Sequence, residues 1–586
     1  MDFSGYRNNC SDYIYSEDYL SFVVKYDKDI QGVYEKINPS CVTIINNQFL
    51  VAYRSVGSNS YGDIFPFGYN FVPKCFGLMD VTAVTDIGAD IVRTLPGLAL
   101  TGKDVIMGFV DTGIDYTSRA FRKADGSTRI LALWDQNEEV LGSGEAIFGY
   151  GAEYSSEDIN MALKEEFPYR RVPSGDADGH GTFLASVAAG SVDEDAMFTG
   201  IAPECDIIMV KLKPAKKVLK DFFLVNDEVP CFSEDDIILG VKYLINKAIE
   251  AKKPLIICMG IGTNQGDHNG NTSLELYFDT IVNLRGVCVV SPVGNELGAR
   301  THYSGNSRLI AESDTDSMEI SVGADDKGFT LEIWGNAPGI MRCSILSPSG
   351  EKFDNIPSIQ DGSARAYFLY EGTSVYIENK VVEENSGDQL IFMRFLSPAQ
   401  GIWTINITET IGFYGRGFDA WLPIRQFLNS DTAFVRPDPD ITLCAPGTGR
   451  GSITAAGYSH YTDALYPQGS RGYTRKGRIK PDITAPASNV YGVFARPGGS
   501  NATISDETLF TRRSGTSIAS ACVAGAACLL MEWGLIRGNL PGINTETIRQ
   551  ILIRGAKSVA DVGYPNRSWG WGVLDLYGSF EMMRNT

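Results

Sequence analysis

Residues 513–530 read RSGTSIASACVAGAACLL and place Ser517 at the start of a run of small and apolar side chains. Such a run predicts a buried helix whose first turn presses against a sheet. The unpaired backbone N–H groups and the positive end of the helix dipole can stabilise an oxyanion that forms beside this serine. Because a serine at this position is most often only a helix cap, a catalytic interpretation needs partner residues.

Two candidate partners precede this helix in the chain. Residues 104–115, DVIMGFVDTGID, form an apolar run that ends at Asp111 and a glycine turn, which predicts Asp111 at the carboxyl end of a parallel strand. Residues 176–190, DADGHGTFLASVAAG, predict a second small-residue helix with His180 near its start. The other three of the four histidines lie in polar, loop-like segments: His268, His302 and His460. Since a serine hydroxyl needs a base, and the base needs a carboxylate, the sequence predicts a triad of Asp111, His180 and Ser517.

A fourth element strengthens this interpretation. Residues 286–295, GVCVVSPVGN, read as another buried strand, and they end at Asn295. The amide NH₂ group of an asparagine can donate to a developing oxyanion, and loss of such a donor typically costs about 3–4 kcal/mol of barrier. We therefore expect Asn295 to belong to an oxyanion hole.

The chain order Asp, His, Ser and four short motifs resemble the subtilase family of serine proteases. The motifs are Asp-Thr-Gly at 111–113, His-Gly-Thr at 180–182, Gly-Asn at 294–295 and Gly-Thr-Ser-x-Ala at 515–519. Each motif is weak alone, but four in this order are specific. The resemblance implies a serine endopeptidase in which Asp111 orients His180 and His180 activates Ser517, while Asn295 stabilises the oxyanion. It implies no cofactor, and no metal site is predicted.

The resemblance extends to a substrate-binding segment. Residues 258–263, CMGIGT, match the place where subtilases bind substrate as an added antiparallel strand through main-chain hydrogen bonds. This match implies that Gly260, Ile261 and Gly262 bind substrate. The family usually has serine where Gly260 stands, and the smaller residue still allows close approach of a backbone.

Size, charge and cysteine usage set further limits. A chain of 586 residues exceeds what one core normally supports, so we expect two or more domains. A net charge of −20 argues against nucleic acid and anionic membrane surfaces as partners. Residues 1–10 show no signal peptide and no later segment reaches the length of a membrane span, so we expect synthesis in the cytoplasm. The eleven dispersed cysteines favour reduced, buried thiols over disulfides or a zinc site.

Residues 1–80 predict a small α+β unit ahead of the first catalytic strand. The patterns indicate a strand at 19–26, a helix at 30–37 and a hairpin of 41–45 with 48–53. The subtilase resemblance implies that this unit is a prodomain, which templates folding of the protease and is cut off between Gly57 and Thr82. An additional β-subdomain without that role is the alternative.

The rest of the chain divides into three segments. Residues 81–313 and 429–586 alternate buried strands with helices, which predicts a subtilisin-like α/β domain: a parallel sheet with helices on both faces. Residues 314–428 instead contain eight short alternating segments, which predict an inserted all-β sandwich of jelly-roll type. We expect a structural or interactive role for this insertion, and sugar binding is the alternative.

A narrower resemblance covers nearly the whole chain. The inserted sandwich and the runs 262–270 (GTNQGDHNG), 294–296 (GNE) and 302–305 (HYSG) are similar to the Csp germination proteases of spore-forming clostridia. This resemblance implies a spore-associated enzyme whose cleaved prodomain stays docked, and whose protein substrate is the precursor of a spore-cortex peptidoglycan hydrolase. Related members have lost triad residues and act in germinant signalling, so a non-catalytic, pseudoprotease-like scaffold is the alternative. A generic degradative subtilase is a third hypothesis.

Overall fold

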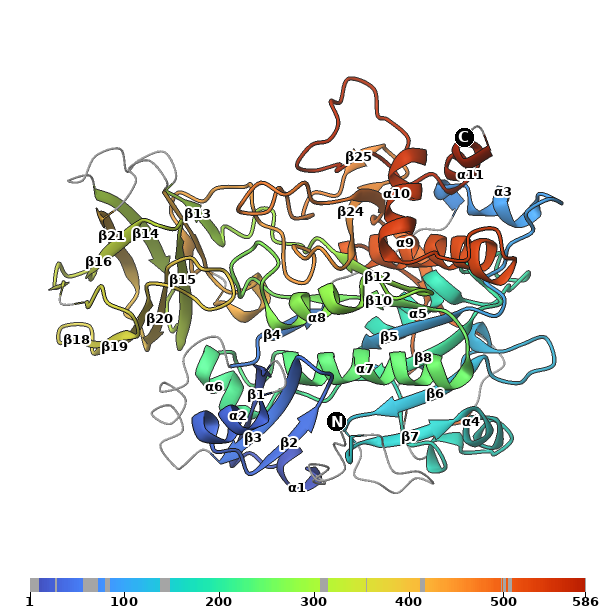
Figure 1. The fold of residues 1–586 in the computed structure, drawn as a ribbon, viewed down its shortest axis with the longest axis horizontal. Helices are drawn as coiled ribbons and strands as arrows, with labels where there is room; N and C mark the ends of the chain where they lie inside the picture. The colour runs from blue at the N-terminus through green and yellow to red at the C-terminus, as the bar shows by residue number, and fades with distance from the viewer. Residues whose placement is uncertain are drawn as a thin grey trace.

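A mainly parallel sheet of nine strands lies at the centre of the molecule (Figure 1). The computed structural model describes residues 10–26, 29–55, 72–78, 85–137, 148–305, 315–354, 356–411, 417–429, 431–496, 498, 502–503 and 508–584. In spatial order the strands are β25 (Ala464–Leu465), β24 (Ile453–Ser459), β12 (Val287–Pro292), β10 (Leu255–Met259), β5 (Ile106–Asp111), β8 (Asp206–Lys211), β6 (Ile130–Asp135) and β7 (Ala152–Ser155), and β26 (Ile483–Pro486) also pairs with β24. All pairings are parallel except those of β25 and β7.

Helices cover both faces of this sheet. Along β5, Ile106 and Val110 join the core under α7 (Glu234–Ala251) and α8 (Ser273–Ile281). Alternate residues of the same strand, such as Met107 and Phe109, join the opposite core, to which α5 (His180–Ala189) and α9 (Thr516–Met531) contribute. A strand that is apolar on both faces needs a cover on both faces, so the predicted α/β architecture is confirmed.

Helix α9 is long and apolar enough to cross a membrane. With the π-helical turn Glu532–Ile536 it forms a stretch of 21 residues, Thr516–Ile536, that passes this test by length and composition. The expectation that no segment reaches that length is therefore wrong. However, 89% of the most apolar window lies inside the molecule, where the small side chains of α9 pack against β10, β12 and β24. These contacts identify α9 as the core helix of the fold.

The inserted region forms two antiparallel sheets that pack around a core of their own. The six-stranded sheet contains β13 (His302–Ser304), β22 (Phe418–Trp421), β15 (Gly328–Gly335), β20 (Leu390–Leu396), β19 (Thr373–Lys380) and β18 (Gly362–Phe368). The five-stranded sheet contains β17 (Lys352–Phe353), β16 (Ile340–Leu346), β21 (Gly401–Ile411), β14 (Thr315–Val322) and β23 (Ala433–Phe434). All eight predicted strands are present, and β13, β17 and β23 are additions. We call this unit the sandwich; its assignment to the jelly-roll type stays a prediction.

The N-terminal unit, residues 10–26 and 29–55, has the predicted strand, helix and hairpin. Its sheet has the order β1 (Tyr19–Lys25), β3 (Phe49–Ser55), β2 (Cys41–Ile44), with helices α1 (Ser11–Ile14) and α2 (Ile30–Ile37). One face of this sheet shares a core with α7 and α8 of the central domain, and the other packs with α2 and α6 (Lys217–Phe223). The unit therefore docks on the same side of the central sheet as α7 (Figure 1).

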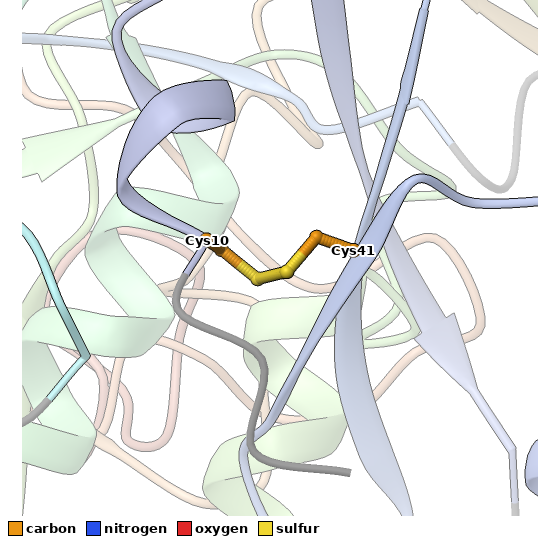
Figure 2. Close-up of a disulfide and its surroundings, with 2 residues drawn as sticks. All are labelled: Cys10 and Cys41. Atoms are coloured by element: carbon orange, nitrogen blue, oxygen red, sulfur yellow. A yellow bond between two sulfur atoms is a disulfide. The ribbon is translucent and has the colours of Figure 1, made fainter.

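A disulfide joins Cys10 to Cys41 within this unit (Figure 2). The expectation of reduced thiols throughout is wrong for this pair, whereas the other nine cysteines are buried and form no disulfide. Cys10 immediately precedes α1 and Cys41 begins β2, and the fold brings their Cα atoms to 5.7 Å, within the range of disulfides. Because the two cysteines are 31 positions apart in the sequence, no local motif predicts the bond.

Several smaller elements complete the described structure. They are α3 (Ala89–Thr94), α4 (Ser156–Ala162), α10 (Thr545–Gly555), α11 (Leu576–Arg584) and the hairpin of β27 (Val490–Val493) with β28 (Phe510–Arg513). The predicted domain boundaries at 80/81 and 313/314 lie outside the described residues, as does most of the predicted cleavage interval 57–82. Only residues 72–78 of that interval are described, and they lie in the candidate active site.

Candidate active site

The structure brings Asp111, His180 and Ser517 into one hydrogen-bonded chain. Nδ1 of His180 lies 2.7 Å from Oδ1 of Asp111, and Nε2 of His180 lies 3.2 Å from Oγ of Ser517. Asp111 ends β5, His180 begins α5 and Ser517 is the second residue of α9. All three side chains are buried, so their interaction is shielded from bulk water. This arrangement of carboxylate, imidazole and hydroxyl is the one that activates a serine.

Backbone contacts between the first two motifs fix the relation of Asp111 to His180. Oδ1 of Asp111 accepts a hydrogen bond from the Thr112 N–H (2.8 Å), and the Thr112 hydroxyl accepts one from the Gly181 N–H (2.9 Å). A Cβ atom at Gly181 would lie 2.3 Å from the carbonyl oxygen of Gly113. Glycine is therefore required in the His-Gly-Thr motif because the backbone of the Asp-Thr-Gly turn passes directly over it.

Asn295 lies beside the start of α9. Its Oδ1 accepts a hydrogen bond from the Thr516 N–H (3.1 Å), and the Thr516 hydroxyl accepts one from the Gly294 N–H (3.2 Å). These two bonds tie the Gly-Asn motif to the residue before Ser517. Because the oxygen of the Asn295 side chain is the acceptor here, its NH₂ group stays the predicted donor to an oxyanion. The first-turn N–H of Ser517 has no acceptor within the helix and supplies a second donor.

Gly260 occupies a space in which no side chain fits. A Cβ atom at this position would lie 2.3 Å from Cδ1 of Leu184, 2.6 Å from Oδ2 of Asp111 and 2.8 Å from Cε1 of His180. Within the described part of the chain, this Oδ2 is buried and has no hydrogen-bond partner. The Leu184 side chain thus fills the space that a serine side chain at position 260 would need. This packing explains why glycine stands here, where the family usually has serine.

A segment of the same chain occupies the predicted substrate position. Strand β4 (Cys75–Leu78) lies between β11 (Ile261–Gly262) and β9 (Phe232–Ser233) in a three-stranded antiparallel sheet. Leu78 is opposite Ile261, and Gly77 is opposite Gly262. Two of the three predicted substrate-binding residues therefore pair with a bound strand through the backbone, whereas Gly260 adjoins the Asp111–His180 pair.

Sequence reasoning did not anticipate the side chains that hold this strand from its other end. Oε1 of Gln265 accepts a hydrogen bond from the Cys75 N–H (2.8 Å), and Oε2 of Glu234 accepts one from the Lys74 N–H (3.2 Å). Gln265 belongs to the run GTNQGDHNG, which is similar to the Csp germination proteases, but that resemblance implied no function for Gln265. Glu234 begins α7, and acidic residues are common in the first turn of a helix, so its position in the sequence indicates no special function.

Two of the remaining histidines have structural roles. The rings of His268 and His302 stack on Trp421 with centroids 3.9 and 4.7 Å away, and both histidines are buried. His268 lies in a polar loop, as predicted, although its side chain is buried, whereas His302 begins β13, so the prediction of a loop-like segment is wrong for His302. The ring nitrogens of His268 face the backbone oxygens of Leu443 and Asn264, and burial lowers its pKa to about 3. Among the described residues, no group of three or more His, Cys, Asp or Glu is placed to hold a metal ion.

Several known proteins are similar to this chain. Two curated proteins of Arabidopsis thaliana, subtilisin-like proteases SBT3.6 and SBT1.7, are 23% and 24% identical over 493 and 474 residues, in each case 73% of this chain. The chain spans little more than half of them, 56% and 57%. The structure of the Clostridium perfringens CspB protease is similar at 28% identity and a TM-score of 0.73, over 86% of this chain and 98% of that one. Since residues 102–572 match the profile of the subtilase family, the chain belongs to that family of serine peptidases.

Proposed function

We propose that this chain is a serine endopeptidase that cuts itself once and then cuts other proteins. The observation that carries the proposal is the hydrogen-bonded chain from Asp111 through His180 to Ser517, next to a peptide strand that pairs with β11. A nucleophile, its base and a backbone-binding edge are the three parts that proteolysis by acyl transfer requires.

The chemistry follows from these positions. Nε2 of His180 takes the proton of the Ser517 hydroxyl while Oγ attacks the carbonyl carbon of the substrate. Asn295 and the Ser517 N–H stabilise the oxyanion, and Asp111 stabilises the imidazolium through Nδ1. His180 then gives its proton to the leaving amine, and water hydrolyses the acyl-enzyme by the same steps. The residues that act need no cofactor.

In this proposal residues 1–80 are the prodomain. Residues 81–313 and 429–586 form the protease domain, and residues 314–428 form the insertion. Support comes from β4, which leads the chain through the substrate position up to Leu78. The cut is therefore expected just beyond Leu78, within residues 79–84, which lie outside the described residues. Further contacts favour a unit that stays docked: Nζ of Lys216 donates to the carbonyl oxygens of Tyr13 (2.7 Å) and Tyr19 (2.8 Å).

The proposed protein substrate is the precursor of a spore-cortex peptidoglycan hydrolase, with the enzyme associated with the spore. The support is the resemblance to the clostridial germination proteases together with the likeness to the CspB protease, which this chain matches over 98% of that chain's length. Incubating the purified chain with such a precursor tests this substrate directly. Cleavage of casein but not of the precursor would favour a generic degradative enzyme.

Comparing the wild-type chain with Ser517→Ala tests the catalytic proposal. We expect the wild type to appear as two fragments in mass spectrometry, with a new N-terminus between residues 79 and 84, and the variant to stay full length. A fluorophosphonate probe should label only the wild type. If both chains stay full length and neither is labelled, the non-catalytic scaffold is the better hypothesis.

A further inference from the structure

Lys74 immediately precedes β4 in the bound segment. This lysine is only 4% exposed, although lysine is among the residues that are least often buried. It borders a small cavity with Trp334, Glu383 and Asn385 of the sandwich and with the segment Gly266–Ser273. The side chain of a residue in the bound segment thus inserts between the protease domain and the inserted sandwich.

Three buried carboxylates lie at or beside this cavity. Glu234 holds the backbone of Lys74 on both sides, because its Oε2 accepts from the Lys74 N–H (3.2 Å) and its N–H donates to the Lys74 carbonyl (3.0 Å). Glu332, in β15 of the sandwich, accepts a hydrogen bond from the Gly266 N–H (3.0 Å). Glu383, also in the sandwich, borders the same cavity as Lys74. Two of the three carboxylates therefore come from the insertion.

Backbone donors hold these carboxylates in place. Oε1 of Glu383 accepts from the Asn385 N–H (3.0 Å) and its Oε2 from the Ser386 N–H (2.6 Å), while Oε1 of Glu234 accepts from the Leu274 N–H (2.9 Å). Negative charge that is fixed before a ligand arrives does not have to be ordered when it binds. The site is therefore built for a cation.

The electrostatics of Lys74 agree with this geometry. Burial lowers its pKa, and the carboxylates of Glu234, Glu332 and Glu383 act in the opposite direction and favour the charged form. Its Nζ also donates to the carbonyl oxygen of Val72 (2.8 Å). An apolar side chain here would leave three buried carboxylates without a cation, and an acidic one would add a fourth negative charge.

We propose that Glu234, Glu332 and Glu383 form an acidic subsite that takes a lysine or arginine side chain, four residues before the position of Leu78, in protein substrates that replace β4. This inference rests on the proposed peptidase function and adds a requirement for a basic side chain at the position of Lys74. It also gives the sandwich a part in substrate choice, because the subsite is incomplete without Glu332 and Glu383.

The rate at which the full chain cuts itself tests the subsite. We expect Lys74→Arg to stay within about three-fold of the wild type, Lys74→Met to be roughly ten-fold slower and Lys74→Glu to be at least about 100-fold slower. The rates come from a time course of fragment formation after synthesis in vitro. Lys25→Glu makes the same charge change at an exposed position of the N-terminal unit and should leave the rate unchanged.

Exchanging the charges of the lysine and one carboxylate separates an effect on recognition of the bound segment from an effect on folding. Glu383→Lys should restore at least ten-fold of the rate lost in Lys74→Glu, whereas Glu384→Lys, an exposed neighbour, should restore nothing. Unfolding temperatures, measured in the Ser517→Ala background, should be similar for both double variants. Wild-type rates for Lys74→Met and Lys74→Glu, or equal rescue by both lysines, would overturn the subsite while leaving the proposed function intact. A wild-type chain that is neither cut nor labelled would contradict the proposed function itself.

Discussion

Substitution of Gly260 by alanine should disable the enzyme by displacing the Asp111–His180 pair. The new Cβ atom would lie 2.3 Å from Cδ1 of Leu184 and 2.6 Å from Oδ2 of Asp111. Carbon atoms in contact are normally about 3.5–4.0 Å apart, so the neighbours must move by roughly 1 Å or more. Leu184 is fully buried and has little room to retreat, so part of this movement falls on the catalytic pair.

The expected effect has two components. Overpacking of this kind costs about 1–3 kcal/mol of unfolding free energy, and a catalytic group misplaced by about 1 Å costs on the order of 100-fold in rate. We therefore expect Gly260→Ala to process itself on the order of 100-fold more slowly than the wild type. Fragment formation over time measures the rate, and chemical unfolding in the Ser517→Ala background measures the stability.

Two further variants make this reasoning refutable. Leu184→Ala, combined with Gly260→Ala, removes the nearest contact of the new Cβ atom and lets that atom move away from Asp111, so the double variant should recover part of the lost rate. Gly97→Ala, where no atom lies within 4 Å of the new Cβ, should change neither quantity. Processing of Gly260→Ala at the wild-type rate, or failure of Leu184→Ala to rescue it, would show that packing does not exclude a side chain here.

Three other predictions concern catalysis, pH and the disulfide. Asp111→Asn should lower the rate of fluorophosphonate labelling and of self-cleavage by about 10⁴-fold, and Asn295→Ala should lower self-cleavage by about 10²–10³-fold. Burial raises the pKa of Glu275 to about 7, so the folded state holds a proton that the unfolded state releases near pH 4.3. The free energy of unfolding, measured by chemical denaturation, should therefore fall as pH rises from about 4.3 to 7. In Glu275→Gln this fall should be smaller, and the same dependence on pH in both proteins would contradict the prediction. Replacing Cys10 and Cys41 by serine should lower the free energy of unfolding by about 2–4 kcal/mol, an effect that dithiothreitol should reproduce in the wild type only.

Local patterns predicted most of the elements and the positions of the triad residues. Residues 105–110, VIMGFV, have no polar side chain before Asp111, which favours a strand buried on both faces, and β5 ends at Asp111 as expected. The small residues of 513–530 likewise predicted a helix pressed against the sheet, as α9 is. In the sandwich, strands such as β14, β16 and β18 have one buried and one more exposed face over much of their length, which is the alternation that predicted strands there.

Features that depend on contacts between distant segments could not be predicted in this way. Strand β6 was missed, and the short edge strands β13 and β23 offer too few residues for a periodic signal. The placement of β4 between β9 and β11 depends on three segments that lie far apart in the chain. The same holds for Glu332 and Glu383, which read as ordinary charges of a solvated sheet until the structure brings them to Lys74.

The disulfide has a consequence for what happens after the chain is cut. Both Cys10 and Cys41 lie on the N-terminal side of the expected cleavage point, and the other nine cysteines form no disulfide. No covalent link among them would therefore tie the detached fragment to the rest of the protein. If the chain cuts itself as proposed, the fragment would act as a competitive inhibitor held by equilibrium binding. Dilution or a more strongly bound protein would then displace it, and the active fraction should depend on enzyme concentration.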